Sequence, residues 1–333
     1  MWASRTPRRC GRHEALTRDV ICVYNGVMRG QAGKESAAGI VYITLTLLAW
    51  SSVPLFLKYF TGYIDGWTTN GWRYGLSALF WLPLLIRGGI RGVLPSKLWR
   101  AAIVPSAVNC IGQACFAWAP YYIDPGLLTF VLRLQIIFVA LGAFLLFPSE
   151  RRVLRAPGYW LAVLLLLAGL VGTCLLGKQS PRGPAAVGIL LTMIAGLFFA
   201  CYSLSVRYFM HDVRSVPAFA VISNYTAAGL VVIMLLGGEG HGFAVAAFTP
   251  GQWGLLVGSA FIGIAFSHVL YYAAMARIGV AVSAGVILLQ PFLTSTASYF
   301  LFSERLTATQ WICGAIAVGG AIAMLRTQQR VSR

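Results

Sequence analysis

The sequence predicts an all-α membrane protein with ten transmembrane helices, arranged as two inverted-topology repeats of five helices each. Three observations predict this fold class: the composition, a series of ten apolar stretches, and a similarity between the two halves of the chain. The 333 residues are 58% hydrophobic and only 11% charged, whereas soluble domains carry about 25% charged residues. This composition argues against a soluble enzyme and excludes a disordered chain.

Charged and turn residues divide the chain into ten stretches of the length that a bilayer requires, about 20 mostly apolar residues. The connections at 123–126 and 277–279 are so short that the helices they join must be antiparallel hairpins. The predicted spans are 38–58, 66–86, 101–121, 125–147, 157–176, 184–208, 216–237, 251–275, 279–302 and 307–325.

The first 36 residues differ from the rest, because they are polar and carry seven of the basic residues. No apolar stretch of signal-peptide length follows the arginines, so the segment is not a secretory signal. It is predicted to be a disordered cytoplasmic tail, and Met28 is an alternative start. The predicted units are this tail at 1–36, repeats at 37–177 and 183–326, and a second cytoplasmic tail at 327–333.

The net charge of +17 invites comparison with nucleic-acid-binding proteins, but the basic residues lie in short loops between apolar stretches. With the N-terminus inside, the inner segments hold 20 Lys and Arg residues and the outer loops hold four. Basic residues concentrate on the cytoplasmic side of membrane proteins. The charge therefore predicts topology, with both termini in the cytoplasm, and no nucleic-acid partner.

The two halves of the chain resemble each other when the sequence is aligned with itself. At an offset of 149, Lys58 falls on Arg207; at an offset of 155, Gln135 falls on Gln290. One residue later in register, 149–151 matches 303–305 as Ser-Glu-Arg. Because each half holds five spans, the second half must enter the membrane in the opposite orientation. Inverted repeats are typical of transporters, with the substrate site near mid-membrane between the halves.

The residues at the ends of this region resemble a known family. The run from Leu47 to Lys58, followed by Arg73, is similar to the opening of EamA-type members of the drug/metabolite transporter superfamily. The stretch 289–306 and the Gly-rich last span resemble the end of that family's second repeat. The resemblance covers roughly 37–326 and implies ten helices, cytoplasmic termini and export or exchange of a small metabolite. It departs at Ile136, where the second repeat has Pro291, so a hinge in the fourth span is uncertain.

The acidic residues argue against several other functions. All nine lie in the tail or at predicted helix ends, whereas proton-driven multidrug pumps usually need a carboxylate within the membrane. The sequence holds no metalloprotease, nucleophile-elbow or phosphate-loop motif. We therefore expect no enzyme, no catalytic residue, no metal and no cofactor.

Two arginines lie within predicted spans, about 10 Å from the outer end at 1.5 Å per residue. Arg73 and Arg133 should face the protein interior or water, because a charge in lipid is costly. Two interpretations are open: the arginines snorkel or pair with Asp65 and Asp124, or they line a cavity for an anionic or zwitterionic substrate.

Four amides within the spans are further cavity candidates. Asn109 and Gln113 lie one turn apart on the same face of the third span, and Gln135 and Gln290 occupy equivalent positions in the two repeats. Such amides either link helices by hydrogen bonds or contact the substrate.

Four residues with ring side chains complete the candidate set. His268 is deep in the eighth span with Tyr272 one turn further, and it is a hydrogen-bonded interior residue or the only mid-membrane group that titrates near neutral pH. Trp50 and Tyr202, one in each half, are suited to the walls of a cavity for a flat substrate. The candidate cavity residues are Trp50, Arg73, Asn109, Gln113, Arg133, Gln135, Tyr202, His268, Tyr272 and Gln290.

The sequence thus predicts an inner-membrane, multi-pass transporter that moves a small metabolite, such as an amino acid or aromatic compound, by alternating access. Export is expected, by a facilitative or exchange mechanism, because no nucleotide motif or intramembrane carboxylate provides energy coupling. The alternative is a flippase-type carrier or accessory subunit for a lipid-linked substrate. The expected partners are the substrate and the bilayer, and the chain is a monomer or homodimer.

Overall fold

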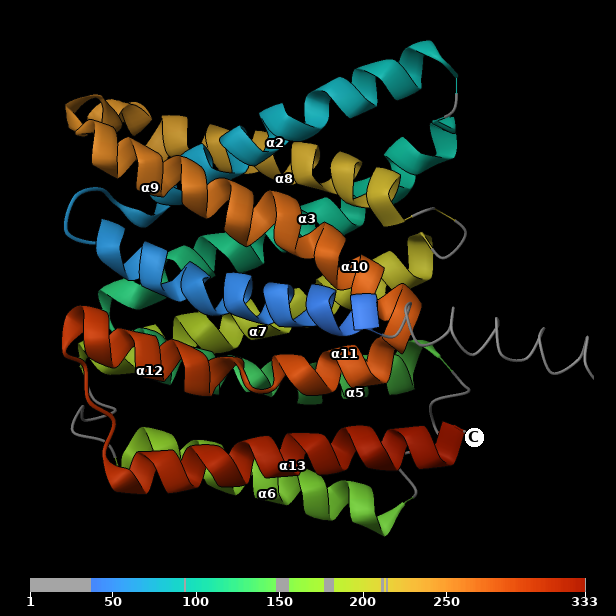
Figure 1. The fold of residues 1–333 in the computed structure, drawn as a ribbon, viewed down its shortest axis with the longest axis vertical. Coiled ribbons are helices and arrows are strands. Elements are labelled where there is room, and N and C mark those ends of the chain that lie inside the picture. Colours follow the sequence, from blue (N-terminus) through green and yellow to red (C-terminus); the bar gives the residue numbers. More distant parts are fainter. Residues whose placement is uncertain are drawn as a thin grey trace, which may run out of the picture.

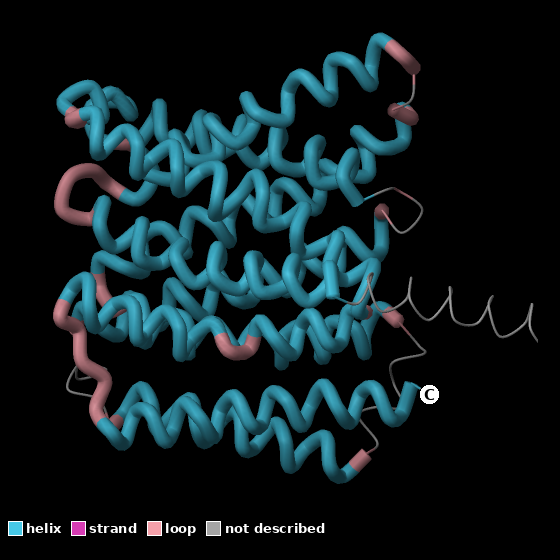
Figure 2. The backbone as a smooth tube through the Cα atoms, in the orientation of Figure 1, coloured by secondary structure: helices cyan, strands magenta, loops and turns pink. Residues whose placement is uncertain are grey.

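The computed structural model describes residues 37–92, 94–147, 156–176, 183–210, 213 and 215–332 of the chain. These residues form long helices that run side by side, joined by short turns, and no strand occurs among them (Figures 1 and 2). The predicted tail at 1–36 lies outside the described residues. At the other end, the last helix continues to Ser332, so most of the tail predicted at 327–333 is helical.

Within the described residues, each half of the chain contributes five helical segments, some of them interrupted. The first half holds a helix at Ala37–Phe60, α2 (Gly66–Ile90), α3 (Ser96–Trp118), η1 (Ala119–Tyr121), α4 (Pro125–Val131), η2 (Leu132–Leu134), α5 (Gln135–Leu146) and α6 (Pro157–Leu175). The second half holds α7 (Pro184–Phe209), α8 (Ser215–Gly237), η4 (Glu239–Ala247), α9 (Pro250–Ala260), η5 (Phe261–Phe266), α10 (Ser267–Ile278), α11 (Val280–Ile287), α12 (Gln290–Phe302) and α13 (Ala308–Ser332).

Nine helical segments of the described chain are long and apolar enough to cross a membrane, and each coincides with a predicted span. The segment missing from the nine is α2, predicted as the second span. It has 25 residues but includes Arg73 and Arg87, which lower its hydropathy. Three boundaries differ by four residues or more from the prediction: α2 continues to Ile90, α3 begins at Ser96, and α13 continues to Ser332.

Short-range interactions fix where several helices begin. The Asp65 carboxylate accepts hydrogen bonds from the backbone N–H groups of Trp67 and Thr68, which caps α2. Thr249 and Gln252 form a capping box at the start of α9. Helices α4, α6, α7 and α9 each begin with a proline, which is favoured there because the first helical N–H has no partner within the helix.

Three predicted spans are not continuous α-helices, which the apolar pattern did not reveal. The span predicted at 125–147 changes to a 3₁₀ turn at Leu132–Leu134. The span predicted at 279–302 is interrupted at 288–289, seen in Figure 2 as a short loop between α11 and α12. The span predicted at 251–275 contains a π-helical segment, Phe261–Phe266. Apolar periodicity does not detect such breaks, because the residues on both sides are equally apolar.

Three pairs of helices that are related by the sequence repeat pack directly on each other in the described part of the chain. Helix α2 packs along α8, α6 along α13, and α4 on α12; the α6–α13 pair forms one edge of the bundle in Figure 1. Glycines bring α6 and α13 together, because a Cβ atom at Gly169 or Gly320 would lie 2.3–2.4 Å from a backbone nitrogen of the other helix. This pairing is what a pseudo-two-fold axis between inverted repeats produces.

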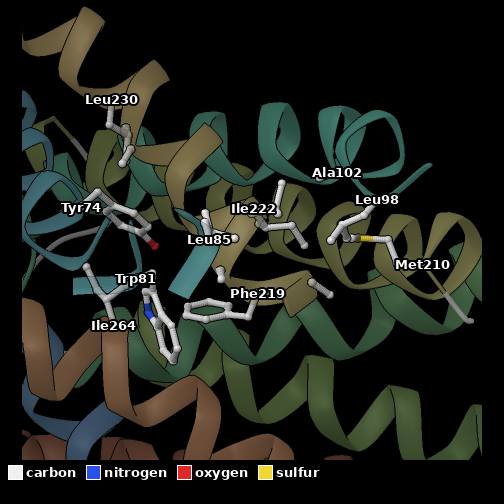
Figure 3. Close-up of a cluster of buried hydrophobic side chains, with 14 residues drawn as sticks. Tyr74, Trp81, Leu85, Leu98, Ala102, Met210, Phe219, Ile222, Leu230 and Ile264 are labelled. Carbon is white, nitrogen blue, oxygen red and sulfur yellow. The ribbon is translucent and has the colours of Figure 1, made fainter. Parts of the chain in front are cut away.

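The largest buried apolar cluster lies where α2, α3, α7, α8 and η5 meet. Figure 3 shows Leu85 and Ile222 in the middle of the cluster, with the Trp81 and Phe219 rings next to each other beside them. Tyr202 and Tyr272 pack against the cluster and are half-buried. Their hydroxyl groups therefore lie beside the main core of the bundle.

Candidate functional site

The interruptions of the two broken spans meet at Arg133. This residue lies in η2 and is 7% exposed. Its Nη1 donates to the backbone carbonyl of Ile287 (3.4 Å), at the end of α11, and its Nη2 donates to Oε1 of Gln290 (2.8 Å), at the start of α12. Its Nε donates to the Thr129 carbonyl at 3.2 Å. The buried guanidinium thus bridges the two repeats at the helix breaks.

Gln290 extends this bridge to the first helix. Its Nε2 donates to the backbone carbonyl of Trp50 at 2.8 Å. One turn along α12, the Thr294 hydroxyl donates to the carbonyl of Ser51 at 3.0 Å. Three elements that are far apart in the sequence, namely η2, α12 and Ala37–Phe60, are therefore joined by hydrogen bonds around one cation.

Aromatic rings gather next to this bridge. The Trp50 ring lies 4.9 Å from the Tyr271 ring and 5.3 Å from the His268 ring, measured between centroids. The His268 ring stacks on Phe219 of α8 at 4.5 Å with an interplanar angle of 13°. Trp50, His268 and Tyr271 are half-buried, so each keeps surface that is not covered by protein.

His268 is held by a backbone hydrogen bond. Its Nδ1 lies 3.0 Å from the carbonyl of Ile264, in the π-helical segment η5 that precedes α10. Because a carbonyl only accepts, Nδ1 carries the hydrogen, and Nε2 is the remaining polar atom of the ring. This hydrogen bond is the one expected of an interior histidine, and a titrating role of His268 stays a prediction. Single π turns within helices are frequent at functional sites.

Asn109 makes a second polar contact between helices. Asn109 Nδ2 donates to the Thr226 hydroxyl at 3.1 Å. Asn109 therefore links α3 to α8, as expected for an amide that joins helices.

Arg73 is buried at a different place from Arg133. Its Nε donates to the Ser259 hydroxyl (3.0 Å) and its Nη1 to Oδ1 of Asn70 (3.0 Å), and the side chain is 1% exposed. Its Nη2 has no hydrogen-bond partner among the described residues. Gly263 of η5 makes room for it, because a Cβ atom there would lie 3.1 Å from Nη2.

The predicted pairing of these arginines with carboxylates is wrong. Neither Arg73 nor Arg133 forms an ion pair within the described part of the chain. Asp65 caps α2 instead, and Asp124 lies near Lys58. Snorkelling is excluded as well, since both guanidinium groups are buried.

Two predicted site residues lie apart from these contacts. Gln113 is half-buried, and its backbone carbonyl accepts a hydrogen bond from Asn70 at 2.7 Å. Gln135, the repeat partner of Gln290, is half-buried at the start of α5, where its backbone lies near Gly196 of α7. The symmetry of the two glutamines in the sequence is therefore not a symmetry of contacts.

Sequence reasoning missed four residues that touch the predicted site. Phe219 and Tyr271 supply ring contacts to His268 and Trp50, and Asn70 and Ser259 hold Arg73. Tyr271 is recognisable as a candidate from its place next to Tyr272. The other three are ordinary span residues whose roles depend on contacts between helices.

The arrangement provides a cation, an amide and aromatic surfaces in one region between the two halves. Arg133 presents five N–H donors, three of which have partners among the described residues. No cluster of three or more potential metal ligands occurs within the described ranges. Chemically, the region is suited to hold a carboxylate next to a flat or apolar group.

Comparison with known proteins identifies the family. The EamA-like transporter family matches residues 37–176 and again residues 186–326, so the two matches together cover most of the chain and coincide with its two repeats. The chain belongs to the EamA-like transporter family. The family match and the apolar helices make it a multi-pass transmembrane protein. No functionally curated protein matches the sequence.

Solved structures share the fold of this EamA-like transporter. One of them, titled "Crystal structure of protein", is 19% identical in sequence and superposes with a TM-score of 0.59. The match covers 89% of the present chain and 97% of the other chain. At this identity the similarity concerns the fold alone.

Proposed function

We propose that this EamA-like transporter moves a small metabolite that carries a carboxylate, such as an amino acid or an aromatic acid, across the inner membrane by alternating access. Arg133 binds the carboxylate, and Trp50, His268 and Tyr271 contact the rest of the molecule. Transport is outward, by facilitated diffusion or exchange, and is driven by the gradient of the substrate itself.

The observation that carries the proposal is the buried Arg133 without a carboxylate partner among the described residues. A buried charge is costly unless it is paired. Carbonyl and amide oxygens stabilise Arg133 only in part, and two of its five N–H donors remain for a ligand. A substrate carboxylate would supply the missing charge with the bidentate geometry that arginine favours.

Competition between matched compounds tests this substrate class. An overexpressing strain is first exposed to a panel of toxic amino-acid and metabolite analogues, to find a compound that is exported. In counterflow with that compound, free acids should compete, whereas the corresponding amides and decarboxylated amines should not. Equal competition by acids and amines would refute binding by Arg133.

In the proposed topology α2 also crosses the membrane, which brings the number of spans from nine to ten, and both termini lie in the cytoplasm. Helix α2 packs along α8, itself an apolar span, which supports α2 as part of the membrane bundle. Reporter fusions after Gly62 and after Gly92 should lie on opposite sides of the membrane. A fusion after Arg333 that is active only in the periplasm would contradict the topology.

Energy coupling is tested in proteoliposomes with equal substrate on both sides. An imposed pH gradient should cause no net accumulation, because the described mid-membrane region holds no carboxylate. Accumulation that is lost in His268→Ala would contradict the proposal and identify His268 as the coupling residue.

A further inference from the structure

An ionic cluster joins the two repeats at the end of the bundle that the charge distribution predicts to face outside. Nζ of Lys58, in the first repeat, lies 3.3 Å from Oε1 of Glu304, in the second repeat. The same ammonium lies 3.9 Å from Oδ1 of Asp124 and donates to the carbonyl of Pro120 at 3.3 Å. These two ion pairs are the ones found in the described part of the chain.

The surroundings of Glu304 favour its protonated form. The residue follows Ser303, whose φ of 57° turns the chain after α12, and its side chain is only 14% exposed. Burial, and then the negative charge of Asp124, raise the pKa of Glu304 to about 7, although the Ser298 hydroxyl and Lys58 act in the opposite direction. A side-chain hydrogen bond to Asp124 also favours the protonated carboxyl group.

A small cavity lies between the two carboxylates. Its volume is about 10 Å³ and its lining includes Asp124, Gly126, Ser295, Ser298 and Glu304. This space is too small for a metabolite, since even one water needs about 10–15 Å³. The wall at Gly126 is close to Ser295, because a Cβ atom added to Gly126 would lie 2.5 Å from the Ser295 hydroxyl oxygen.

Ser295 provides independent evidence that the cavity is a site. Its hydroxyl lines the cavity, has no hydrogen-bond partner among the described residues, and belongs to a residue that is 3% exposed. Buried hydroxyl groups are normally hydrogen-bonded. A hydroxyl both donates and accepts, so Ser295 is suited to either form of a neighbouring carboxyl group.

The charges of the cluster do not balance when both acids are ionised. Two carboxylates then face one ammonium. Arg305 is the other charged residue next to Glu304, and its guanidinium lies over the Tyr299 ring, 5.3 Å from the ring centroid. One bound monovalent cation restores neutrality, and a proton fits the space of about 10 Å³ between the two carboxylates; Ser295 and Glu304 also line a neighbouring cavity of about 290 Å³.

We propose that Glu304 and Asp124, together with Ser295 and Ser298, form a proton-binding site that controls the contact between the two repeats at this end of the transporter. With Glu304 ionised, Lys58 of the first repeat is paired with Asp124 of the same repeat and bridges to the second repeat through Glu304. With Glu304 protonated, Lys58 keeps only the longer contact to Asp124 within its own repeat, and a neutral carboxyl group hydrogen-bonded to Asp124 replaces the ion pair between the repeats, so this end of the bundle separates more readily. The proton enters and leaves from one side, so it changes the rate of transport and is not carried across.

Infrared titration of the purified full-length protein tests the site without any substrate. Between about pH 5 and about pH 9, a carboxylic acid band should titrate near neutral pH, disappear in Glu304→Gln and persist in Glu239→Gln, a matched change at an exposed acid. Asp124→Asn should lower the midpoint and Ser298→Ala should raise it, because these residues respectively disfavour and favour the ionised form. A band unchanged in Glu304→Gln would overturn the proposal.

Replacing sodium by choline separates a proton site from a sodium site. The midpoint should be the same in sodium chloride and choline chloride. A midpoint that falls in sodium would mean that sodium competes for the site, which overturns the proton as its natural ligand.

The effect on transport rests on the proposed function and is measured separately. With equal pH on both sides, exchange should become about tenfold faster from about pH 8 to about pH 6, which is the change in the protonated fraction of a group with a pKa of about 7. In Glu304→Gln the rate should be high and independent of pH. A Glu304→Gln variant that keeps the wild-type pH profile would refute the proposal that Glu304 controls the contact between the repeats. If no tested substrate is transported, only the proposed function is contradicted, because the infrared titration does not depend on a substrate.

Discussion

The fourth span and its repeat partner, the ninth, are both interrupted just before a glutamine, but by different means. In the first repeat a 3₁₀ turn at Leu132–Leu134 separates α4 from α5, and no proline follows. In the second repeat the helix is interrupted at 288–289, and Pro291 is the second residue of α12. The first repeat therefore has a 3₁₀ turn where the second repeat has a break followed by a proline.

The difference gives the two interruptions complementary roles. Proline has no backbone N–H. The carbonyl of Ile287, four residues before Pro291, therefore has no helical partner. That carbonyl accepts from Arg133, which lies in the 3₁₀ turn of the other repeat. One repeat thus supplies the cation, and the other supplies a free carbonyl and the Gln290 amide.

The largest effect is expected from removing that amide. In Gln290→Leu, Arg133 Nη2 and the Trp50 carbonyl both lose a buried partner, at a cost of about 1–3 kcal/mol for each unsatisfied group. Transport should be abolished, measured as uptake into proteoliposomes from protein that is still expressed and folded.

The matched control is the repeat partner, Gln135→Leu. No hydrogen bond of the Gln135 side chain to another described residue is found, so transport should change by less than about threefold, or less than about 0.7 kcal/mol. If Gln135→Leu and Gln290→Leu were equally inactive, or both active, the two interruptions would not differ as described.

A smaller effect is expected from Arg133→Lys, which keeps the charge but loses the planar fork. One amine cannot reach the Ile287 carbonyl, the Gln290 amide and a substrate carboxylate together, so substrate affinity should fall about tenfold, equivalent to about 1.4 kcal/mol. Arg73→Lys is the control: it should lower the melting temperature and leave substrate affinity unchanged. Equal loss of affinity in both variants would place Arg73 in the substrate site as well.

The sequence predicted the helices better than their interruptions. Charges and turn residues separate the spans, so nine of the predicted spans coincide with apolar helices, and Gly169 and Gly320 support the packing of repeat-related helices. The interruptions depend on contacts between helices: Arg133 at the 3₁₀ turn bonds to residues more than 150 positions away. No local pattern contains that information.

The structure brings several candidate residues together, and their role in substrate binding stays a prediction. Arg133, Gln290, Trp50 and His268 all lie in or next to the inter-repeat bridge. The predicted carboxylate partners of the arginines were wrong, because proximity along the membrane axis does not specify which helix faces which. Glu304 was counted as an ordinary helix-end acid, and only its burial next to Asp124 distinguishes it.

The smallest effect is expected from Pro291→Ala, which tests the role assigned to the proline. An alanine N–H can bond to the Ile287 carbonyl and compete with Arg133 Nη1, whose present contact is long at 3.4 Å. The loss of one such hydrogen bond is worth about 0.5–1.5 kcal/mol, so substrate affinity should fall by about two- to tenfold. The reciprocal change, Ile136→Pro, places a proline in the first turn of α5, where it is tolerated, and should leave affinity unchanged. Counterflow affinities of the two variants decide the matter: wild-type affinity in Pro291→Ala would show that Arg133 does not depend on a carbonyl freed by the proline.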